Sequence, residues 1–456
     1  MRRRALLAGA LGGVAVSIGG YRAVDRIRGG EESTPYRPLG RVPLADAKEA
    51  VVDGGVAYAA VADGIATVDV SDPADPTVLA EQRGLLADRP GGPMEQLWDV
   101  AIDGDRLLVA GPANPVGGDA IQGLLLYDVS EPAAPRRVAF HETDFPIHNA
   151  TIRDGRAYLT GNDRDREPLV IVDVREDGPE EVGRWSLLDH DTGWGDVDPR
   201  LRWLHDVHVR NDLAFLALWD AGTWFVDVSD PSDPTAVGNV GGRSIDELAS
   251  IPSSAVQDET IALPGNHHYA TSNEAGTVLG TNEEAWAANA TGDGGPGGID
   301  LWDVRDPSAP THLATIDPPP TPDPTYSVSP LAAGSGGART DPVLPHTKCH
   351  ECGAIGDGVW TTSHNFQLAG DRLFTSWYQG GVKIHDIGDP ADPTELAWWR
   401  RPDETSFWTA QLADESTVVA SSMGWDGDGM GAIYTFPNRP GEQDDPPSLA
   451  AADRAE

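Results

Sequence analysis

One short phrase recurs along this chain and limits its fold more than any other feature. Each copy is an alternating apolar strand that ends in Asp, then a Ser/Asp-Pro turn, then another short strand. The copies are VDVSDPADP at 68–76, LYDVSEPAAP at 126–135, a degenerate copy at 172–179, VDVSDPSDP at 226–234, WDVRDPSAP at 302–310 and HDIGDPADP at 385–393. Because Pro fixes φ and has no N–H for a strand ladder, each turn marks where one strand ends and the next begins. Recurrence along the whole chain indicates a repeat architecture.

Each copy lies in a unit of four short strands joined by short turns. The clearest unit reads LHDVHVR at 204–210, LAFLALW at 213–219, TWFVDVS at 223–229 and TAVGNVG at 235–241. Short turns predict a four-stranded antiparallel meander. The same frame fits 48–83, 97–142, 147–187, 267–316 and 363–400, and a seventh unit at 407–436 has no fourth strand.

The missing strand is expected at the other end of the chain. Residues 35–43, PYRPLGRVP, resemble a fourth strand, with LGRV placed like VGNV of 237–240. An N-terminal strand that completes the last sheet closes a ring of sheets and removes its open edges. We therefore predict an all-β fold over residues 35–436: a seven-bladed β-propeller of four-stranded antiparallel blades, closed by the N-terminal strand.

Two families resemble parts of this pattern. The run LVIVDV at 169–174, with WFVDVSDP and LLLYDVSEP, resembles the LVIVD repeat of bacterial and archaeal surface propellers. This resemblance implies the fold and leaves the activity open, because propellers host many unrelated activities. The unit that begins LHDVHVR is also similar to one blade of the selenium-binding proteins. That family includes methanethiol oxidases, uses His-bound copper and carries a Cys-x-x-Cys.

The charge is strongly negative. The chain has 72 acidic and 33 basic residues, a formal net charge of −39. Such self-repulsion is screened in high salt, so we expect a halophilic protein, with an ordinary acidic protein as the alternative. Nucleic acid is not an expected partner because no basic patch is present. We expect a monomer.

The two ends of the chain differ from the repeats. The start, MRRRALLAGALGGVAVSIGG, resembles a twin-arginine export signal. Residues 1–34 are therefore interpreted as an export signal or uncleaved N-terminal anchor plus a linker. This predicts an extracellular or cell-surface protein whose contact with a membrane is limited to that anchor. Residues 437–456, rich in Pro and acids, are expected to form a disordered tail.

Superposition of the units reveals a column of residues at the start of each first strand. It contains Lys48, Trp98, His148, His205, His268, His364 and Trp408, and His267 competes with His268 for its place. First strands line the axis of a propeller, so one column converges in the channel. Four imidazoles there could hold Cu, Fe or Zn, and Asn or Asp after a histidine could orient its ring. The alternative is a polar plug in which the histidines bond to water and to Asn149, Asp206 or Asn365.

A second group of possible ligands lies in the linker at 317–362. HTKCHEC contains the only two cysteines, Cys349 and Cys352, with His346 and His350. Its spacing fits a disulfide, a Zn or Cu site, or a redox dithiol.

The strand order places the histidines on the same face as the loops between second and third strands. Those loops contain Trp219, Asp220, Glu283, Glu284 and Trp286, among other aromatic and acidic residues. No P-loop, G-x-S-x-G or HExxH motif is present, so no nucleotide cofactor is expected. Our hypothesis is a metal-dependent oxidoreductase acting on a small molecule, such as a sulfur compound, at this loop face. The rival is a non-enzymatic surface module that binds a partner there.

Overall fold

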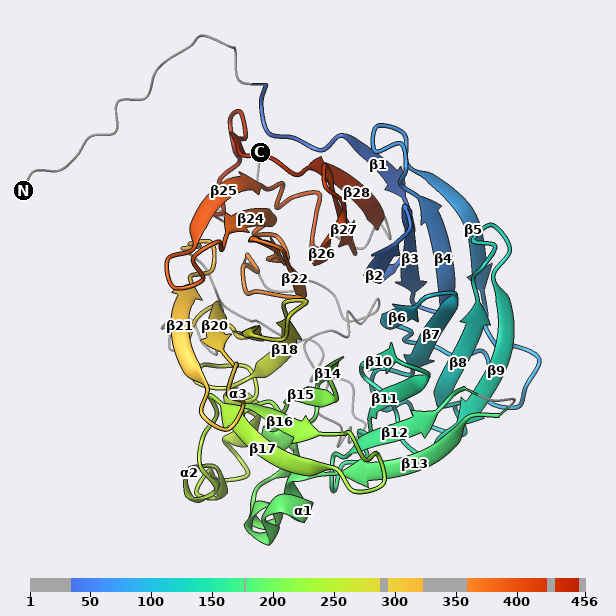
Figure 1. Cartoon of the computed structure of the whole chain (residues 1–456), viewed down its shortest axis with the longest axis vertical. Helices are drawn as coiled ribbons and strands as arrows, with labels where there is room; N and C mark the ends of the chain where they lie inside the picture. The colour runs from blue at the N-terminus through green and yellow to red at the C-terminus, as the bar shows by residue number, and fades with distance from the viewer. Residues whose placement is uncertain (1–33, 176–177, 288–293, 323–358, 425–430, 451–456) are drawn as a thin grey trace, which may run out of the picture. The chain divides into compact units, whose positions relative to one another are not determined.

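The computed structural model describes residues 34–175, 178–287, 294–322, 359–424 and 431–450. Their strands form seven separate antiparallel sheets, and Figure 1 shows these sheets arranged as blades around a ring. Six sheets have four strands and the sheet of blade 6 has a fifth, short strand. The predicted seven-bladed β-propeller is therefore confirmed.

The first strand of each blade lies nearest the middle of the ring (Figure 1). First strands of neighbouring blades contact one another around the whole ring. In blades 1 to 7 they are β2 (Ala47–Asp53), β6 (Asp99–Asp103), β10 (Ala150–Arg153), β14 (Asp206–Arg210), β18 (His267–Ser272), β22 (Phe366–Ala369) and β26 (Phe407–Asp414). Their starts therefore face one shared channel.

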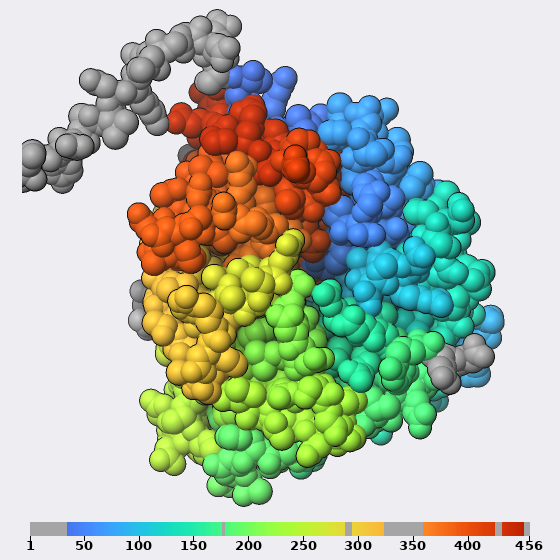
Figure 2. All heavy atoms as spheres, in the orientation of Figure 1, coloured from blue at the N-terminus to red at the C-terminus, as the bar shows by residue number. Residues whose placement is uncertain are grey.

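The middle strands of each blade are almost continuously buried, because neighbouring blades cover both faces of the sheet. The run LVIVD is itself a third strand, and its four apolar residues are all buried. The second strands are β3 (Val56–Val61), β7 (Arg106–Gly111), β11 (Arg156–Thr160), β15 (Leu213–Ala217), β19 (Val278–Glu283), β23 (Arg372–Ser376) and β27 (Thr417–Ser422). The third strands are β4 (Gly64–Asp69), β8 (Gly123–Asp128), β12 (Leu169–Asp173), β16 (Thr223–Asp227), β20 (Ile299–Asp303), β24 (Val382–Asp386) and β28 (Ala432–Pro437). Figure 2 shows the blades packed as sectors around the middle of one face.

The repeated phrase forms the turn between the third and fourth strands. In blade 1 the carboxylate of Asp69 accepts hydrogen bonds from the backbone N–H and the hydroxyl of Ser71, at 2.9 and 2.6 Å. Asp128 with Ser130 repeats this arrangement in blade 2. The fourth strands are β5 (Thr77–Arg83), β9 (Arg136–Glu142), β13 (Glu180–Trp185), β17 (Thr235–Val240), β21 (Thr311–Ile316), β25 (Thr394–Trp399) and, in blade 7, β1 (Gly40–Pro43).

The ring closes as predicted. Strand β1 pairs antiparallel with β28, with Gly40 opposite Thr435 and Pro43 opposite Ala432. Figure 1 shows this blue strand from the start of the chain beside the red strands from its end. The closure joins the two ends of the propeller through backbone hydrogen bonds and leaves no open edge on β28.

The expected disordered tail is wrong for residues 437–450. Strand β29 (Gly441–Glu442) pairs in parallel with the outer strand β25. The side chain of Gln443 accepts a hydrogen bond from the backbone of Arg400, and Leu449 is buried. These contacts are with residues far away in the sequence, so the local richness in Pro and acids did not indicate them. Residues 451–456 lie outside the described part.

The linkers before and after blade 4 contain short helices. The first linker contains α1 (Leu187–His190), η1 (Thr192–Asp196) and η2 (Pro199–Arg202), and the second contains α2 (Ile245–Ala249) and α3 (Val256–Glu259). Their apolar side chains join the core of blade 4, which includes Trp194 and Leu248. Among the residues that the structure describes, no helix is long and apolar enough to cross a membrane.

Candidate metal centre

The seven residues of the predicted column form a closed ring of contacts in the channel. We call Lys48, Trp98, His148, His205, His268, His364 and Trp408 the axial ring. Ring centroids are 4.1 Å apart for His148 and His205, 4.1 Å for His205 and His268, and 4.5 Å for His268 and His364. The His364–Trp408, Trp408–Trp98 and Trp98–His148 centroids are 4.3, 6.0 and 5.9 Å apart. The ammonium of Lys48 lies over both indoles, 5.6 Å from Trp98 and 4.8 Å from Trp408.

Backbone carbonyls orient three of the histidines. Nδ1 of His148 lies 2.8 Å from the carbonyl of Ala113, Nδ1 of His205 lies 3.0 Å from that of His268, and Nδ1 of His364 lies 2.7 Å from that of Trp408. A carbonyl oxygen can only accept, so each Nδ1 carries the proton and donates it. In its neutral form, an imidazole held in this way has its lone pair on Nε2, which is the form that binds a metal.

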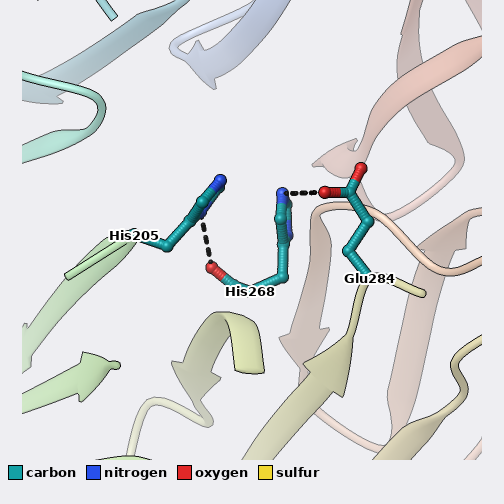
Figure 3. Close-up of side chains that lie close together, drawn as sticks. All are labelled: His205, His268 and Glu284. Atoms are coloured by element: carbon teal, nitrogen blue, oxygen red, sulfur yellow. Dashed lines mark hydrogen bonds and ion pairs between the residues drawn. The ribbon is translucent and has the colours of Figure 1, made fainter. Parts of the chain in front are cut away.

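Three residues bring metal-binding atoms together. One ligand atom each from His205, His268 and Glu284 lies within 4.8 Å of the other two, and all three residues are buried. We call these residues the metal group. Figure 3 shows His268 between the other two, with its Nε2 3.6 Å from Oε2 of Glu284. Atoms that bind one ion at about 2.1 Å lie up to about 4.2 Å apart, so the group needs only small side-chain rotations to hold an ion.

The predicted set of four histidines is only partly reproduced. His205 and His268 belong to the metal group, whereas His148 and His364 lie on either side of it. The four side chains come from four consecutive blades, and among the described residues it is His205 and His268 that join Glu284 in the group of close ligand atoms. His267 is not part of the ring, because its Nδ1 pairs with the hydroxyl of Thr223 at 2.9 Å. A β-bulge between His267 and Tyr269 turns His268 inward.

Glu284 is the member of the metal group that the sequence alone did not single out as a possible ligand. It directly follows strand β19, in the loop between the second and third strands of blade 5, so this loop and the ring histidines share a face, as expected. Asn266 holds its backbone on both sides: Glu284 N–H donates to the Asn266 carbonyl at 2.9 Å, and the Asn266 amide donates to the Glu284 carbonyl at 3.0 Å. The strand register could have indicated Glu284 as a neighbour of the histidine. Glu284 lies two residues after Asn282, and Asn282 pairs with Tyr269, the residue that follows His268.

A layer of buried polar residues follows the axial ring along the first strands. The amide of Asn149 donates to Asp206 at 3.1 Å and that of Asn365 donates to Glu49 at 2.6 Å, so these residues bond to one another instead of orienting the rings. Burial raises the pKa of Asp99 to about 8 and that of Asp206 to about 7. Burial, with the nearby Asp99, also raises the pKa of Glu49 well above its ordinary value.

An apolar cluster packs against the axial ring. It joins two members of the ring, Trp98 and Trp408, to Ala113, Ile261, Trp286, Trp360 and Tyr378, all buried. Trp219 lies against His205, with centroids 5.0 Å apart. The metal group is thus enclosed by weakly polar walls, which strengthen electrostatic interactions inside. Cys349, Cys352, His346 and His350 of the other predicted site lie outside the described residues.

Comparisons with known proteins support the fold. A family model of the LVIVD repeat matches residues 45–81 and 204–241, which lie in blades 1 and 4. No curated protein matches significantly. Nothing in these comparisons supports the similarity to selenium-binding proteins.

Solved propellers are similar in fold alone. The β-propeller domain of Cps50 (Swd1) from Myceliophteria thermophila has a TM-score of 0.53 and 11% identity, covering 87% of this chain and 98% of that one. The WD40 β-propeller domain of Doa1 has a TM-score of 0.50 and 9% identity, covering 89% of this chain and 97% of that one. Identities this low carry no information on function. The chain is therefore a seven-bladed β-propeller that carries LVIVD repeats.

Proposed function

We propose that this propeller binds one transition-metal ion in its channel through His205, His268 and Glu284. The observation that carries the proposal is the convergence of their ligand atoms within 4.8 Å at a buried place. Two imidazoles and a carboxylate are the ligands of many zinc and non-haem iron sites, and imidazole also suits copper.

The reaction class that we assign to the site is metal-dependent oxidation of a small molecule. The metal would supply the redox chemistry, while the protein residues bind and orient it. The aromatic cluster would exclude water from the site, and the His148 and His364 rings would flank the ion. The substrate remains the small, sulfur-containing class expected from the sequence. Export through a twin-arginine signal and adaptation to high salt are part of the same proposal and rest on the sequence.

A second candidate function is favoured by the depth of the site. His205 and His268 are each 1% exposed and Glu284 is 0% exposed. A metal with fully enclosed ligands is typical of a structural ion. The propeller would then be a surface binding module whose ion fixes the channel, and its partner would bind on the loop face.

The test is metal content. The protein is purified after exposure to Zn²⁺, Fe²⁺ or Cu²⁺, desalted and analysed for metal and protein. We expect about one ion per chain, lost in His205→Ala and in the near-isosteric Glu284→Gln, and retained in His312→Ala on the outer strand β21. Retention in His148→Ala separates the metal group from a four-histidine site. An unmodified chain that holds no metal under any of these conditions contradicts the proposal.

The two candidate functions differ in their requirement for turnover. For the oxidoreductase, oxygen consumption or reduction of an electron acceptor should depend on both the metal and a small thiol or sulfide. For the binding module, metal should raise the melting temperature without any turnover.

A further inference from the structure

The same loop position holds three different side chains in blades 4, 5 and 6. In blades 4 and 5, the residue after the ring histidine pairs with a residue of the second strand: Asp206 with Ala217 in blade 4, and Tyr269 with Asn282 in blade 5. Ala217 and Asn282 are therefore equivalent. Trp219 lies two residues after the first of them and Glu284 two residues after the second. In blade 6 the backbone of His364 donates to Ser376, as His205 donates to Ala217, so Tyr378 is the third member. This position therefore supplies one metal-group ligand and an aromatic neighbour on each side of it.

The two aromatic residues at this position, Trp219 and Tyr378, have the same strained backbone conformation. Trp219 and Tyr378 have φ of 47° and 46°, a left-handed conformation that is rare for bulky residues. The Trp219 carbonyl accepts from Gly222 at 3.2 Å and from His267 at 3.1 Å, and the Tyr378 carbonyl accepts from Gly381 at 3.2 Å and from Phe407 at 3.0 Å. The loop frame thus imposes the conformation in both blades. It directs each ring against the histidine of its own blade, with centroids 5.0 Å apart for Trp219 and His205 and 4.8 Å for Tyr378 and His364.

The polar atoms of the two side chains go to different partners. The indole N–H of Trp219 donates to the carbonyl of Thr260 in the linker, at 3.2 Å. The hydroxyl of Tyr378 donates to Oε1 of Glu284. The other oxygen of that carboxylate, Oε2, is the one 3.6 Å from Nε2 of His268. Tyr378 and the metal group therefore use opposite oxygens of the same carboxylate.

We infer that Tyr378 is a positioning residue of the metal centre, which rests on the proposed metal binding. Its hydroxyl fixes the rotation of the Glu284 carboxylate, so that Oε2 alone is directed at the ion. Packing fixes the hydroxyl in turn: Tyr378 is 0% exposed, and its ring also lies against Trp360, with centroids 5.6 Å apart. A hydrogen-bonding partner of this kind typically changes metal affinity by about 10–100-fold when it is removed.

The test compares Tyr378→Phe with Tyr127→Phe. Tyr127 is a buried tyrosine of blade 2 within a separate apolar cluster, so its variant measures the general effect of losing a buried hydroxyl. Zn²⁺ affinity is measured by competition with a chelator. The visible absorption of bound Co²⁺ is recorded as a second readout, because its d–d bands report the coordination geometry.

We expect Tyr378→Phe to lower Zn²⁺ affinity about 10–100-fold and to change the Co²⁺ spectrum, with neither effect in Tyr127→Phe. A purely structural role for Tyr378 would lower the melting temperature and leave the spectrum of the bound ion unchanged. Equal affinity and spectrum in both variants and the unmodified protein would overturn the role of Tyr378 while metal binding stands. An unmodified protein that binds neither ion would overturn the proposed function, and this inference with it.

Discussion

At the residue scale, three carboxyl groups with strongly raised pKa values lie just beyond the axial ring. Asp99, Asp206 and Glu49 are all buried, and Asp99 and Asp206 both act to raise the pKa of Glu49. Asp99 accepts a hydrogen bond from the backbone N–H of Ala150, at 2.7 Å, on the inner edge of blade 3. Two residues further along the first strand of blade 6, the uncharged Gln367 accepts a hydrogen bond from the backbone N–H of Leu412 in blade 7. An uncharged side chain can therefore also act as the acceptor for the inner backbone edge of the next blade.

The pKa of Asp99 predicts how stability depends on pH. Its pKa is about 8 in the folded protein and 3.8 in an unperturbed chain. Between these values the folded state holds more protons than the unfolded state, so the free energy of unfolding falls as pH rises. The stability that protonated Asp99 contributes to the folded state is fully present below about pH 4 and is lost above about pH 8. We expect Asp99→Asn to flatten the decline between pH 5 and 8 by up to about 1.4 kcal/mol per pH unit.

Denaturant unfolding at several pH values and constant salt measures this slope. The exposed Asp75→Asn variant makes the same change in charge on a surface turn and should leave the slope unchanged. Parallel curves for Asp99→Asn and the unmodified protein would show that Asp99 is not the group responsible.

At the element scale, the repeated turn also joins neighbouring blades. The carbonyl of Pro231, in the turn of blade 4, lies against Gly183 of the outer strand β13 in blade 3. Pro307 lies in the same way against Gly238 of β17. Pro73 lies against Gly40 of β1, which explains why LGRV can replace VGNV in the ring.

These glycines let the proline carbonyl of the next blade lie close to the outer strand, and none of them needs a positive φ. A Cβ atom at Gly183 would lie 1.7 Å from the Pro231 carbonyl oxygen, so the two blades would have to move apart. We expect Gly183→Ala to lower the free energy of unfolding by about 1–3 kcal/mol, the usual effect of overpacking. Gly195→Ala is the matched control, because no atom lies within 4 Å of its added Cβ. Urea unfolding of the three proteins measures the difference, and equal midpoints would contradict the close contact.

At the scale of the whole molecule, the net charge of −39 is the dominant electrostatic feature. Arg83, Arg243 and other arginines form local ion pairs, but they are far fewer than the acidic residues. The remaining repulsion opposes compaction and is screened by salt. The screening length falls from about 30 Å at 0.01 M to about 3 Å at 1 M salt.

We therefore expect the melting temperature to rise steeply with NaCl over this range and more slowly above it. Differential scanning calorimetry at a series of NaCl concentrations measures the rise. Sucrose, which screens no charge, serves as the control. A melting temperature independent of NaCl would remove the basis for the halophilic expectation.

The sequence by itself determined the blades, because the information needed is local. Alternating apolar residues specify strands, and the Asp and Pro of each phrase specify the turn through contacts within a few residues, such as Asp69 with Ser71. Since every unit repeats the same register, the histidine column also followed from alignment.

Only the tertiary structure decided which side chains form the metal group. Glu284 and Tyr378 lie in loops of the neighbouring blades 5 and 6 and meet only when these two blades pack against each other. The bulge that turns His268 inward depends on pairing with β19, and the order of residues 437–450 depends on pairing with β25. A repeat pattern predicts the strands and turns within each blade. The physical reason for the difference is that the candidate site arises from contacts between blades.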